Sequence, residues 1–309
     1  MRWRSRLSKE IQAFFSFDQP LSGMTTLGVG GPAECLARPK TLGEFCLFLD
    51  FCRSEGTPLW IIGSGSNILV PDDGLPGITL QTFGLNGIFW EEQGDFVLLY
   101  AESGVLMASL LGLSIRKGWS GLEFSAGIPG TLGGALSGNA GVGDLSIGGL
   151  VESVGVVDTN GKVETRQAGD CIFSYRYSSI GEEGTPIIFC TLRLERSSPD
   201  HVADGTRKML SRRKGQPKGA RTAGCIFKNP PGQSAGMLLD EAGCKGMSCG
   251  GATISRRHAN FIENSGSATA GDVASLIVKC ADRVRGRTGI SLQREIRFLG
   301  YIPHEKINY

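Results

Sequence analysis

Apolar residues recur along the first quarter of the chain with a helical period and then as a continuous run. Residues 41–56 carry them at helical spacing behind a Thr-x-x-Glu capping box, and Gly56 ends the pattern. A strand is expected before this helix, over residues 33–38, and a continuously apolar strand after it, over 58–62. The pattern therefore predicts a strand-helix-strand beginning. Residues 1–22, ahead of it, are expected to form a short amphipathic helix with an irregular exit.

The later pattern predicts a mixture of strands and helices. We expect a strand over 96–101, a helix over 105–117, and a hairpin of 151–158 with 162–165 around Asn160-Gly161. A strand over 187–194 precedes a boundary at Ser197-Ser198-Pro199, and Asp200 is expected to cap the next helix. A Thr269-x-x-Asp272 box predicts another helix. The closing strand, 290–298, alternates and places Glu295 on its polar face.

Glycine is concentrated between residues 121 and 141. A main chain without β-carbons can approach a ligand closely, which favours phosphate or a flat ring. The alternative is a flexible linker. Apolar residues at 122, 124, 128, 132 and 136 alternate with the glycines, and a linker needs no such anchors. We interpret the stretch as a cofactor cradle.

A second glycine turn, Gly63-Ser64-Gly65-Ser66-Asn67-Ile68, directly follows the strand expected over 58–62. Two glycines and two hydroxyls in that position are typical of a phosphate-holding turn. The turn matches the first half of the dinucleotide fingerprint Gly-x-Gly-x-x-Gly, but Ile68 stands where the third glycine belongs. A standard Rossmann site is therefore disfavoured, and no nucleoside-triphosphate P-loop motif occurs.

Composition narrows the class of protein. The 309 residues include 46 glycines and 13 prolines and carry a net charge of +2, which argues against disorder and against a nucleic-acid binder. The nine cysteines form no Cys-x-x-Cys pair, so neither a metal site nor a disulfide framework is expected. No secretory signal and no membrane-spanning stretch is recognisable. These features predict a soluble, cytoplasmic protein.

A basic run of seven Lys and Arg residues between 207 and 221 contains no acid. It could be a solvated helix face, or it could grip a diphosphate, because fixed cations beside turns suit phosphate oxygens. Residues 222–231 follow and bring a thiol, Cys225, an amine and an amide into one turn-rich stretch. From composition alone, Cys225 is an ordinary small apolar residue.

Several segments together resemble one family, the UDP-N-acetylenolpyruvoylglucosamine reductases (MurB) of peptidoglycan synthesis. They keep the family's order across almost the whole chain from about residue 22. The matching segments are 25–33, 61–70, 121–141, Phe-Ser-Tyr-Arg-Tyr-Ser at 173–178, 212–230, 251–264 with His-Ala-Asn-Phe at 258–261, and 292–300.

The resemblance implies an α+β fold, with a two-lobed FAD-binding domain of the vanillyl-alcohol-oxidase/PCMH type and a C-terminal α+β substrate-binding domain. The implied divisions are an N-terminal extension (1–22), two FAD lobes (23–82 and 83–197) and a substrate domain (198–309). It also implies two stretches that bind FAD. The residues are Gly63, Ser64, Gly65, Ser66, Asn67, Ile68, Gly127, Ile128, Pro129, Gly130, Thr131, Gly133, Gly134, Ala135, Asn139, Ala140 and Gly141.

The family reaction takes hydride from NADPH through FAD to an enolpyruvyl double bond, whose other carbon is then protonated. Carried over by motif, Arg176 grips and polarises the substrate carboxylate, and Glu295 orients the site or shares the proton work. Cys225 stands where better-known members have serine as the proton donor. A thiol, with a pKa of about 8.5 in water, is a more acidic donor than an alcohol, so we expect Cys225 to be the general acid.

Substrate contacts follow from the same resemblance. We expect a small nucleotide-sugar substrate held by Tyr175, Arg213, Lys214, Lys218, Asn229 and Gln293. The short interval between Arg176 and Ser197 leaves no room for an inserted tyrosine loop, so the chain resembles the shorter class of the family. His258 is interpreted as structural rather than substrate-binding. A monomer without metal, membrane or nucleic-acid partners is expected.

Two other functions stay open from sequence alone. One is an FAD-dependent oxidase of the same superfamily, which the Cys-Ile-Phe-Lys-Asn-Pro and Leu-Gln-Arg-Glu segments disfavour. The other is a non-catalytic nucleotide-sugar sensor. Cys225 in place of serine favours the sensor, whereas the presence of both Arg176 and Glu295 favours the enzyme.

Overall fold

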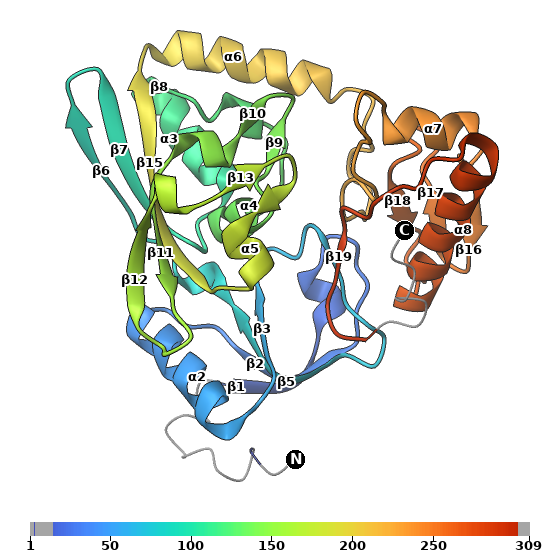
Figure 1. The fold of residues 1–309 in the computed structure, drawn as a ribbon, viewed down its shortest axis with the longest axis horizontal. Coiled ribbons are helices and arrows are strands. Elements are labelled where there is room, and N and C mark those ends of the chain that lie inside the picture. Colours follow the sequence, from blue (N-terminus) through green and yellow to red (C-terminus); the bar gives the residue numbers. More distant parts are fainter. Residues whose placement is uncertain (1–2, 4–14, 302–309) are drawn as a thin grey trace. The chain divides into compact units, whose positions relative to one another are not determined.

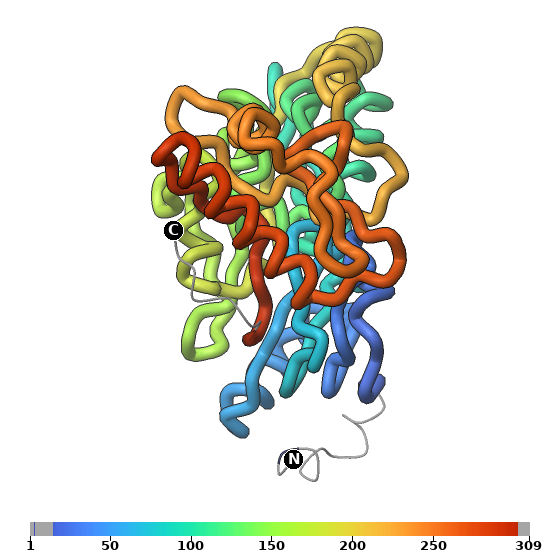
Figure 2. The backbone as a smooth tube through the Cα atoms, turned by 90° about the vertical axis from the view of Figure 1, so that its right-hand side faces the viewer, coloured from blue at the N-terminus to red at the C-terminus, as the bar shows by residue number. Residues whose placement is uncertain are grey.

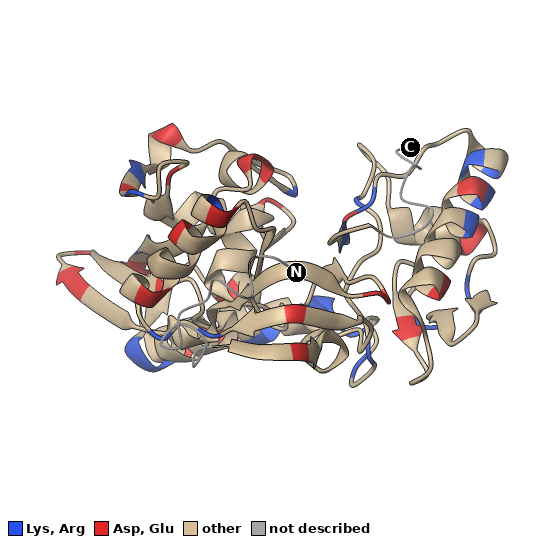
Figure 3. Ribbon diagram, turned by 90° about the horizontal axis from the view of Figure 1, so that it is seen from below, with Lys and Arg blue, Asp and Glu red and all other residues tan. Residues whose placement is uncertain are grey.

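The computed structural model describes Trp3 and residues 15–301 (Figure 1). The described chain forms two compact units that interleave along the sequence. The first comprises residues 37–64 and 80–214, and the second comprises 16–36, 65–79 and 215–301. No helix among the described residues is long and apolar enough to cross a membrane. Figure 3 shows basic and acidic residues in both units.

The first unit is built on a six-stranded antiparallel sheet. Its strands, in order across the sheet, are β12 (Val163–Gln167), β11 (Val151–Val157), β15 (Ile187–Arg196), β7 (Phe96–Glu102) and β6 (Ile88–Gln93), with β8 (Trp119–Ser120) paired to β15. Residues of β7 alternate between buried and half-buried positions. This alternation gives the sheet one face that packs on a core.

Helices α3 (Met107–Lys117) and α4 (Leu132–Ser137) pack on that face. The core joins Leu110 and Leu136 from the two helices to Leu99 and Leu192 from the sheet, all 0% exposed. The remaining helices of the unit are α2 (Leu42–Glu55), α5 (Ser179–Glu183) and α6 (Pro199–Arg212), and β3 (Leu59–Ile62) follows α2. The glycine stretch, residues 121–141, thus follows α3 and β8 and includes α4, and all three elements contribute residues to this core.

Local signals decide where α2 begins and ends. The Thr41 hydroxyl accepts a hydrogen bond from Glu44 N at 3.1 Å, and Gly56 ends the helix with φ 60°. The Glu44 carboxylate accepts from Lys40 N at 2.7 Å, one residue before the expected partner. The predicted helix is confirmed, with a capping interaction displaced by one residue.

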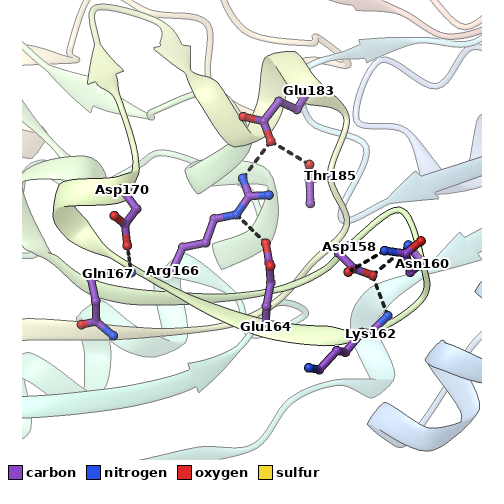
Figure 4. Close-up of polar contacts among 9 residues, drawn as sticks. All are labelled: Asp158, Asn160, Lys162, Glu164, Arg166, Gln167, Asp170, Glu183 and Thr185. Atoms are coloured by element: carbon purple, nitrogen blue, oxygen red, sulfur yellow. Dashed lines mark hydrogen bonds and ion pairs between the residues drawn. The ribbon is translucent and has the colours of Figure 1, made fainter.

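The predicted hairpin at Asn160 is also confirmed, and its loop has the three residues left between the predicted strands. Gly161 N donates to Asp158 O and Asp158 N donates to Lys162 O, so three residues form the loop, with Gly161 at φ 83°. Backbone N–H donors, chiefly that of Lys162, hold the pKa of the Asp158 carboxyl below its usual value. Figure 4 shows this turn and the neighbouring Arg166, which bonds two carboxylates.

The second unit combines small sheets with two helices. A four-stranded sheet has the order β1 (Phe15–Pro20), β2 (Pro32–Ala37), β5 (Leu75–Gln81) and β3, of which β1, β2 and β5 lie mostly in this unit and β3 belongs to the first. A second sheet joins β16 (Ser248–Cys249), β17 (Ala252–Ile254) and β18 (Ile262–Asn264), and β19 (Arg297–Phe298) pairs parallel with β4 (Ile68–Leu69). The helices are α7 (Ala235–Glu241) and α8 (Ala270–Thr288), the long red helix of Figure 2.

Helix α8 begins at the predicted capping box. Thr269 and Asp272 exchange side chain-to-backbone hydrogen bonds, and Asp72 accepts from Ala270 N at 2.7 Å and from Gly271 N at 3.1 Å. A carboxylate at this end also complements the helix dipole. The buried face of the helix includes all of the residues expected from its apolar period, namely Val273, Leu276, Ile277, Cys280 and Val284.

Three expectations about elements are wrong. Residues 15–20 form β1 rather than part of a helix over 1–22, and residues 1–2 and 4–14 lie outside the described chain. Ser198, not Asp200, caps α6, because its hydroxyl accepts from His201 N at 3.2 Å. The closing strand is confined to β19, since residues 290–296 hold only an isolated bridge at Arg294. In addition, β5 lies between β2 and β3 in the sheet, so the two strands on either side of α2 are not neighbours.

Candidate active site

Arg176 lies in the tight turn of a hairpin in the first unit. β13 (Phe173–Ser174) and β14 (Tyr177–Ser178) pair antiparallel and leave Tyr175 and Arg176 as the turn residues. Arg176 has φ 51°, a left-handed conformation that costs a non-glycine residue about 1–3 kcal/mol. Its Nη1 donates to Gly141 O at 3.1 Å, and its guanidinium carbon lies 5.4 Å from the Tyr175 ring centre. The hairpin therefore presents a guanidinium beside the end of the glycine stretch.

Asn139 joins this hairpin to the glycine stretch. Its side chain is buried, and its Nδ2 donates to Ser174 O at 2.7 Å while its Oδ1 accepts from Gly148 N at 3.0 Å. Asn139 itself has φ 45°. A left-handed residue whose amide is engaged at both ends fixes the separation of two loops. Asn139 was expected to bind FAD, and in the structure its side chain supports the Arg176 hairpin.

Gly63 and several glycines of the 121–141 stretch leave no room for a β-carbon. A Cβ at Gly63 would lie 2.3 Å from Thr131 Oγ1, and one at Gly133 would lie 2.9 Å from the Ser103 Cβ. Thr131 also caps α4 by accepting from Gly134 N. These glycines therefore allow backbone segments of the first unit to pack closely, as a cofactor cradle requires.

Two buried hydroxyls border this packing. Among the described residues, Ser64 Oγ and Ser103 Oγ are buried and have no hydrogen-bond partner. A buried hydroxyl without a partner costs free energy, about 1–3 kcal/mol, unless a ligand supplies the missing bond. Ser64 belongs to the phosphate-type turn predicted from sequence. These residues therefore fit a group that brings hydrogen-bond acceptors, such as a diphosphate.

Arg213 is half-buried at the C-terminal end of α6 and packs against the glycine stretch. A Cβ at Gly127, which has φ 75°, would lie 3.3 Å from Arg213 Nε and 3.4 Å from Leu210 Cδ2. Of the predicted substrate cations, Arg213 is thus brought against the cradle within the first unit. Lys214 and Lys218 are exposed.

The second half of the Gly63 turn belongs to the second unit. Gly65 has φ 64°, and a Cβ there would lie 2.2 Å from Met24 O. Asn67 Nδ2 donates to Glu295 O at 3.1 Å, and Asn67 O accepts from Arg297 N at 3.0 Å. The turn predicted to hold phosphate therefore lies directly beside the segment that carries Glu295.

Cys225 and Glu295 come together in the same unit on neighbouring backbone segments. Phe227 forms an antiparallel bridge with Arg294, and Glu295 N donates to Ile226 O at 2.7 Å. On the other side of the segment, Cys225 forms an antiparallel bridge with Phe261. Cys225 and Glu295 are both half-buried. They lie 70 residues apart in the sequence, and the fold brings Glu295 into contact with Ile226, the residue after Cys225.

Exposure distinguishes Cys225 from most other cysteines. Six of the nine are buried, and burial raises the pKa of Cys52 to about 12 and also raises that of Cys190. A buried thiol also lacks the access to substrate and solvent that a proton donor needs. The partly exposed cysteines are Cys46, Cys225 and Cys249. Of these, Cys225 is the one beside Glu295.

Other expected contacts lie close to this pair. Lys228 N donates to Gln293 O at 2.8 Å, and the Asn229 Oδ1 accepts from Ala235 N at 2.9 Å. His258 packs edge to face on Phe261, with ring centres 5.0 Å apart, which fits its structural interpretation. The supporting roles of Ser103 and Asn260 could not be recognised from sequence, because their partners lie about 30 residues or more away along the chain.

Two family models match the chain. One, described as the C-terminal domain of UDP-N-acetylenolpyruvoylglucosamine reductase, matches residues 216–299, which carry Cys225 and Glu295. The other, described as an FAD binding domain, matches residues 33–166, which include both glycine segments. Each model therefore covers one of the two regions that the geometry singles out.

Proteins named UDP-N-acetylenolpyruvoylglucosamine reductase are similar over nearly the full chain. The protein from Moorella thermoacetica is 41% identical over 92% of this chain and 92% of its own length, and that from Chlamydia felis is 39% identical over 91% and 93%. The crystal structure of the Thermus caldophilus reductase matches with a TM-score of 0.76 and 34% identity, covering 93% of this chain and 98% of that one. The chain thus belongs to the UDP-N-acetylenolpyruvoylglucosamine reductase family, with an α+β fold that includes a PCMH-type FAD-binding domain.

Proposed function

We propose that this chain is the NADPH-dependent enzyme that reduces UDP-N-acetylglucosamine enolpyruvate to UDP-N-acetylmuramate, a step of peptidoglycan precursor synthesis. Family membership at up to 41% identity supports the reaction. The observation that carries the catalytic assignment is the pairing of the Cys225 and Glu295 segments within one unit. When bound, FAD accepts hydride from NADPH and passes it to the enolpyruvyl double bond.

Ser64 and the glycine segments hold the FAD. The buried Ser64 hydroxyl and the backbone of the 63–68 turn suit its diphosphate, and the closely packed 127–141 stretch would contribute further backbone contacts to it. The remaining FAD contacts are those expected from sequence. The glycines of these segments let the backbone approach the cofactor closely and supply N–H donors, but they take no part in the reaction itself.

Arg176 binds and polarises the carboxylate of the enolpyruvyl group. Hydride addition at one carbon builds negative charge that spreads onto this carboxylate, and a planar guanidinium stabilises it with two parallel hydrogen bonds. The contacts to Gly141 O and the Tyr175 ring orient the guanidinium before substrate arrives. Little orientation then remains to be lost during the reaction.

Cys225 protonates the second carbon. The S–H bond breaks as the new C–H bond forms, and the electron pair left on carbon by hydride addition takes up the proton. The resulting thiolate regains a proton from water, which the half-buried position of Cys225 permits. Glu295, on the adjoining backbone segment, orients the site and shares this proton transfer.

Further features belong to the same proposal. Tyr175, Gln293, Asn229 and the cations Arg213, Lys214 and Lys218 contact the nucleotide sugar. The chain works as a cytoplasmic monomer without a nucleic-acid partner, and its FAD lobes (23–82 and 83–197) and substrate domain (198–309) follow the family's division. The mass of the native protein in solution tests the monomer.

The decisive variant is Cys225→Ala, measured in single turnovers. Loss of the proton donor should slow reoxidation of the bound flavin by the enolpyruvyl sugar about 10²–10⁴-fold, while flavin reduction by NADPH keeps its rate. Cys249→Ala, which changes another partly exposed thiol of the second unit, is the matched control. Unchanged reoxidation in Cys225→Ala would falsify the assignment.

A spectrum separates this function from the two alternatives. Under anaerobic conditions NADPH should bleach the flavin absorption, and the enolpyruvyl sugar should restore it. An oxidase would regain its absorption only with oxygen. A sugar sensor would bind the nucleotide sugar without any change in oxidation state.

A further inference from the structure

The segment that carries Cys225 is held between two others within the second unit. Ile226 N donates to Asn260 O at 3.0 Å on one side, and Ile226 O accepts from Glu295 N at 2.7 Å on the other. A single residue, Ile226, therefore connects the segment of Asn260 to the segment of Glu295. Any shift of this residue along the chain direction moves the neighbouring Cys225 with it.

Asn260 adds a second attachment one residue further on. Its side-chain Oδ1 accepts from Phe227 N at 2.9 Å, and its Nδ2 donates to Phe227 O at 2.8 Å. Both residues are almost fully buried, with exposed fractions of 2% for Asn260 and 1% for Phe227. An amide that meets both polar groups of one residue accepts a single register, because a displaced strand would leave buried groups without partners.

We call the two side-chain hydrogen bonds between Asn260 and Phe227 the Asn260 clamp. His258 holds Asn260 in place for this clamp. Asn260 N donates to His258 Nδ1 at 3.2 Å, and Phe261 N donates to His258 O at 3.1 Å. Gly236 makes room for the imidazole, since a Cβ there would lie 2.8 Å from His258 Cε1. The backbone and side chain of Asn260 are thus both fixed before they engage Phe227.

We propose that Asn260 is a positioning residue for proton transfer, acting through Phe227 to set where the Cys225 thiol sits beside Glu295. The inference rests on the proposed role of Cys225 as the acid. Proton transfer needs donor and acceptor atoms within about 2.6–3.2 Å, and a displacement of about 1 Å can cost 10²-fold in rate. Flavin reduction by NADPH does not use the thiol and is independent of the clamp.

The test is Asn260→Asp. The new side chain keeps the shape of asparagine and can still accept from Phe227 N, but as a carboxylate it cannot donate to Phe227 O. At pH 8 a carboxylate oxygen would face Phe227 O, the strand would shift, and the reaction with the enolpyruvyl sugar should slow about 10–100-fold. Burial and the facing carbonyl raise the pKa of the new carboxyl. Acidification protonates it, the donor returns, and the rate relative to wild type should recover toward pH 6.

Asn264→Asp is the matched control. Asn264 is also buried and also donates through Nδ2 to a carbonyl, that of Leu27 at 2.9 Å, but it holds a different segment. This variant removes an equivalent donor and should keep the wild-type pH profile of the sugar reaction. Thermal unfolding of both variants, and alkylation of Cys225 followed by mass spectrometry, supply readouts apart from turnover. We expect altered alkylation of Cys225 in Asn260→Asp alone.

The outcomes separate the two proposals. Slow sugar reduction in Cys225→Ala combined with wild-type behaviour of Asn260→Asp at pH 8 overturns the positioning role and leaves the acid in place. Normal sugar reduction in Cys225→Ala overturns the acid. Equal loss of both half-reactions in Asn260→Asp, following its unfolding temperature, shows a structural residue and overturns the inference. If Asn260→Asp does not fold, Asn260→Ser is judged by the same three comparisons.

Discussion

Two buried asparagines hold the two catalytic regions in different ways. In the first unit, Asn139 joins Ser174 O to Gly148 N and so ties together two separate loops beside Arg176. In the second unit, Asn260 accepts from Phe227 N through Oδ1 and donates to Phe227 O through Nδ2. One amide fixes a distance between segments, and the other fixes the register of one segment. In the proposed mechanism, the position of Arg176 therefore depends on loop separation, and that of Cys225 depends on the register of its segment.

The largest effect expected on the first region comes from the guanidinium itself. Arg176→Lys keeps the charge but loses the planar fork, so sugar reduction should slow about 10²-fold in single turnovers while NADPH oxidation keeps its rate. Arg166→Lys, in an exposed ion-pair network of the same unit, is the control and should behave as wild type. Equal slowing of both half-reactions by Arg176→Lys would contradict its assignment to the carboxylate.

Loss of the two side-chain hydrogen bonds of Asn139 should give a smaller effect of a different kind. Asn139→Gly relieves the positive φ but removes both hydrogen bonds, so we expect the KM for the sugar to rise about tenfold and the free energy of unfolding to fall by about 1–3 kcal/mol. Steady-state kinetics, flavin content and urea unfolding measure these changes. Asn160→Gly, in an exposed turn, controls for the substitution. A change confined to kcat would contradict this, because Asn139 would then affect the reaction rate, as Asn260 is expected to do, and not the binding of the sugar.

The smallest expected effect is a loss of stability at low pH that arises at His258, the residue that supports the Asn260 clamp. Burial lowers the pKa of His258, and the charge of Lys245 lowers it further, so the folded ring stays neutral more readily than a histidine of the unfolded chain, with its pKa near 6.5. The folded state then binds fewer protons. The contribution of His258 to stability is complete above about pH 6.5 and decreases as the pH falls below that value.

Urea unfolding between pH 7.5 and 5.5 checks this sign. The wild type should lose more stability over that interval than His258→Gln, because protonation at Nδ1 removes the acceptor for Asn260 N–H. Asn139 bonds only backbone amide groups through its side chain, so the first clamp should not share this response. Parallel pH dependence of the two proteins would refute the link to His258.

The sequence predicted those features whose causes are local. Thr41 and Gly56 lie at the ends of α2, and Thr269 with Asp272 begins α8, because caps act within a few residues. The helix expected over 1–22 is wrong at β1, since the period of so short a segment does not reveal its partner strand.

The candidate site shows the same division. Resemblance picked out Arg176, Cys225 and Glu295, but not the left-handed turn at Arg176 or the amide of Asn260. Phe227 lies 33 residues from Asn260 along the chain, so the clamp exists only once the fold has formed. Residue types suggested the chemistry, and tertiary contacts decide where its atoms lie.

The discontinuity of the second unit has a consequence for synthesis of the protein. Its segments 16–36 and 65–79 are made well before their partners in 215–301. At about 5–20 residues per second, these early strands wait roughly 10–40 s for the rest of their unit. Strand edges without partners are sites of aggregation during that interval. The nascent chain therefore spends much of its translation with β4 lacking its partner strand β19, and the unit that carries Cys225 is completed last.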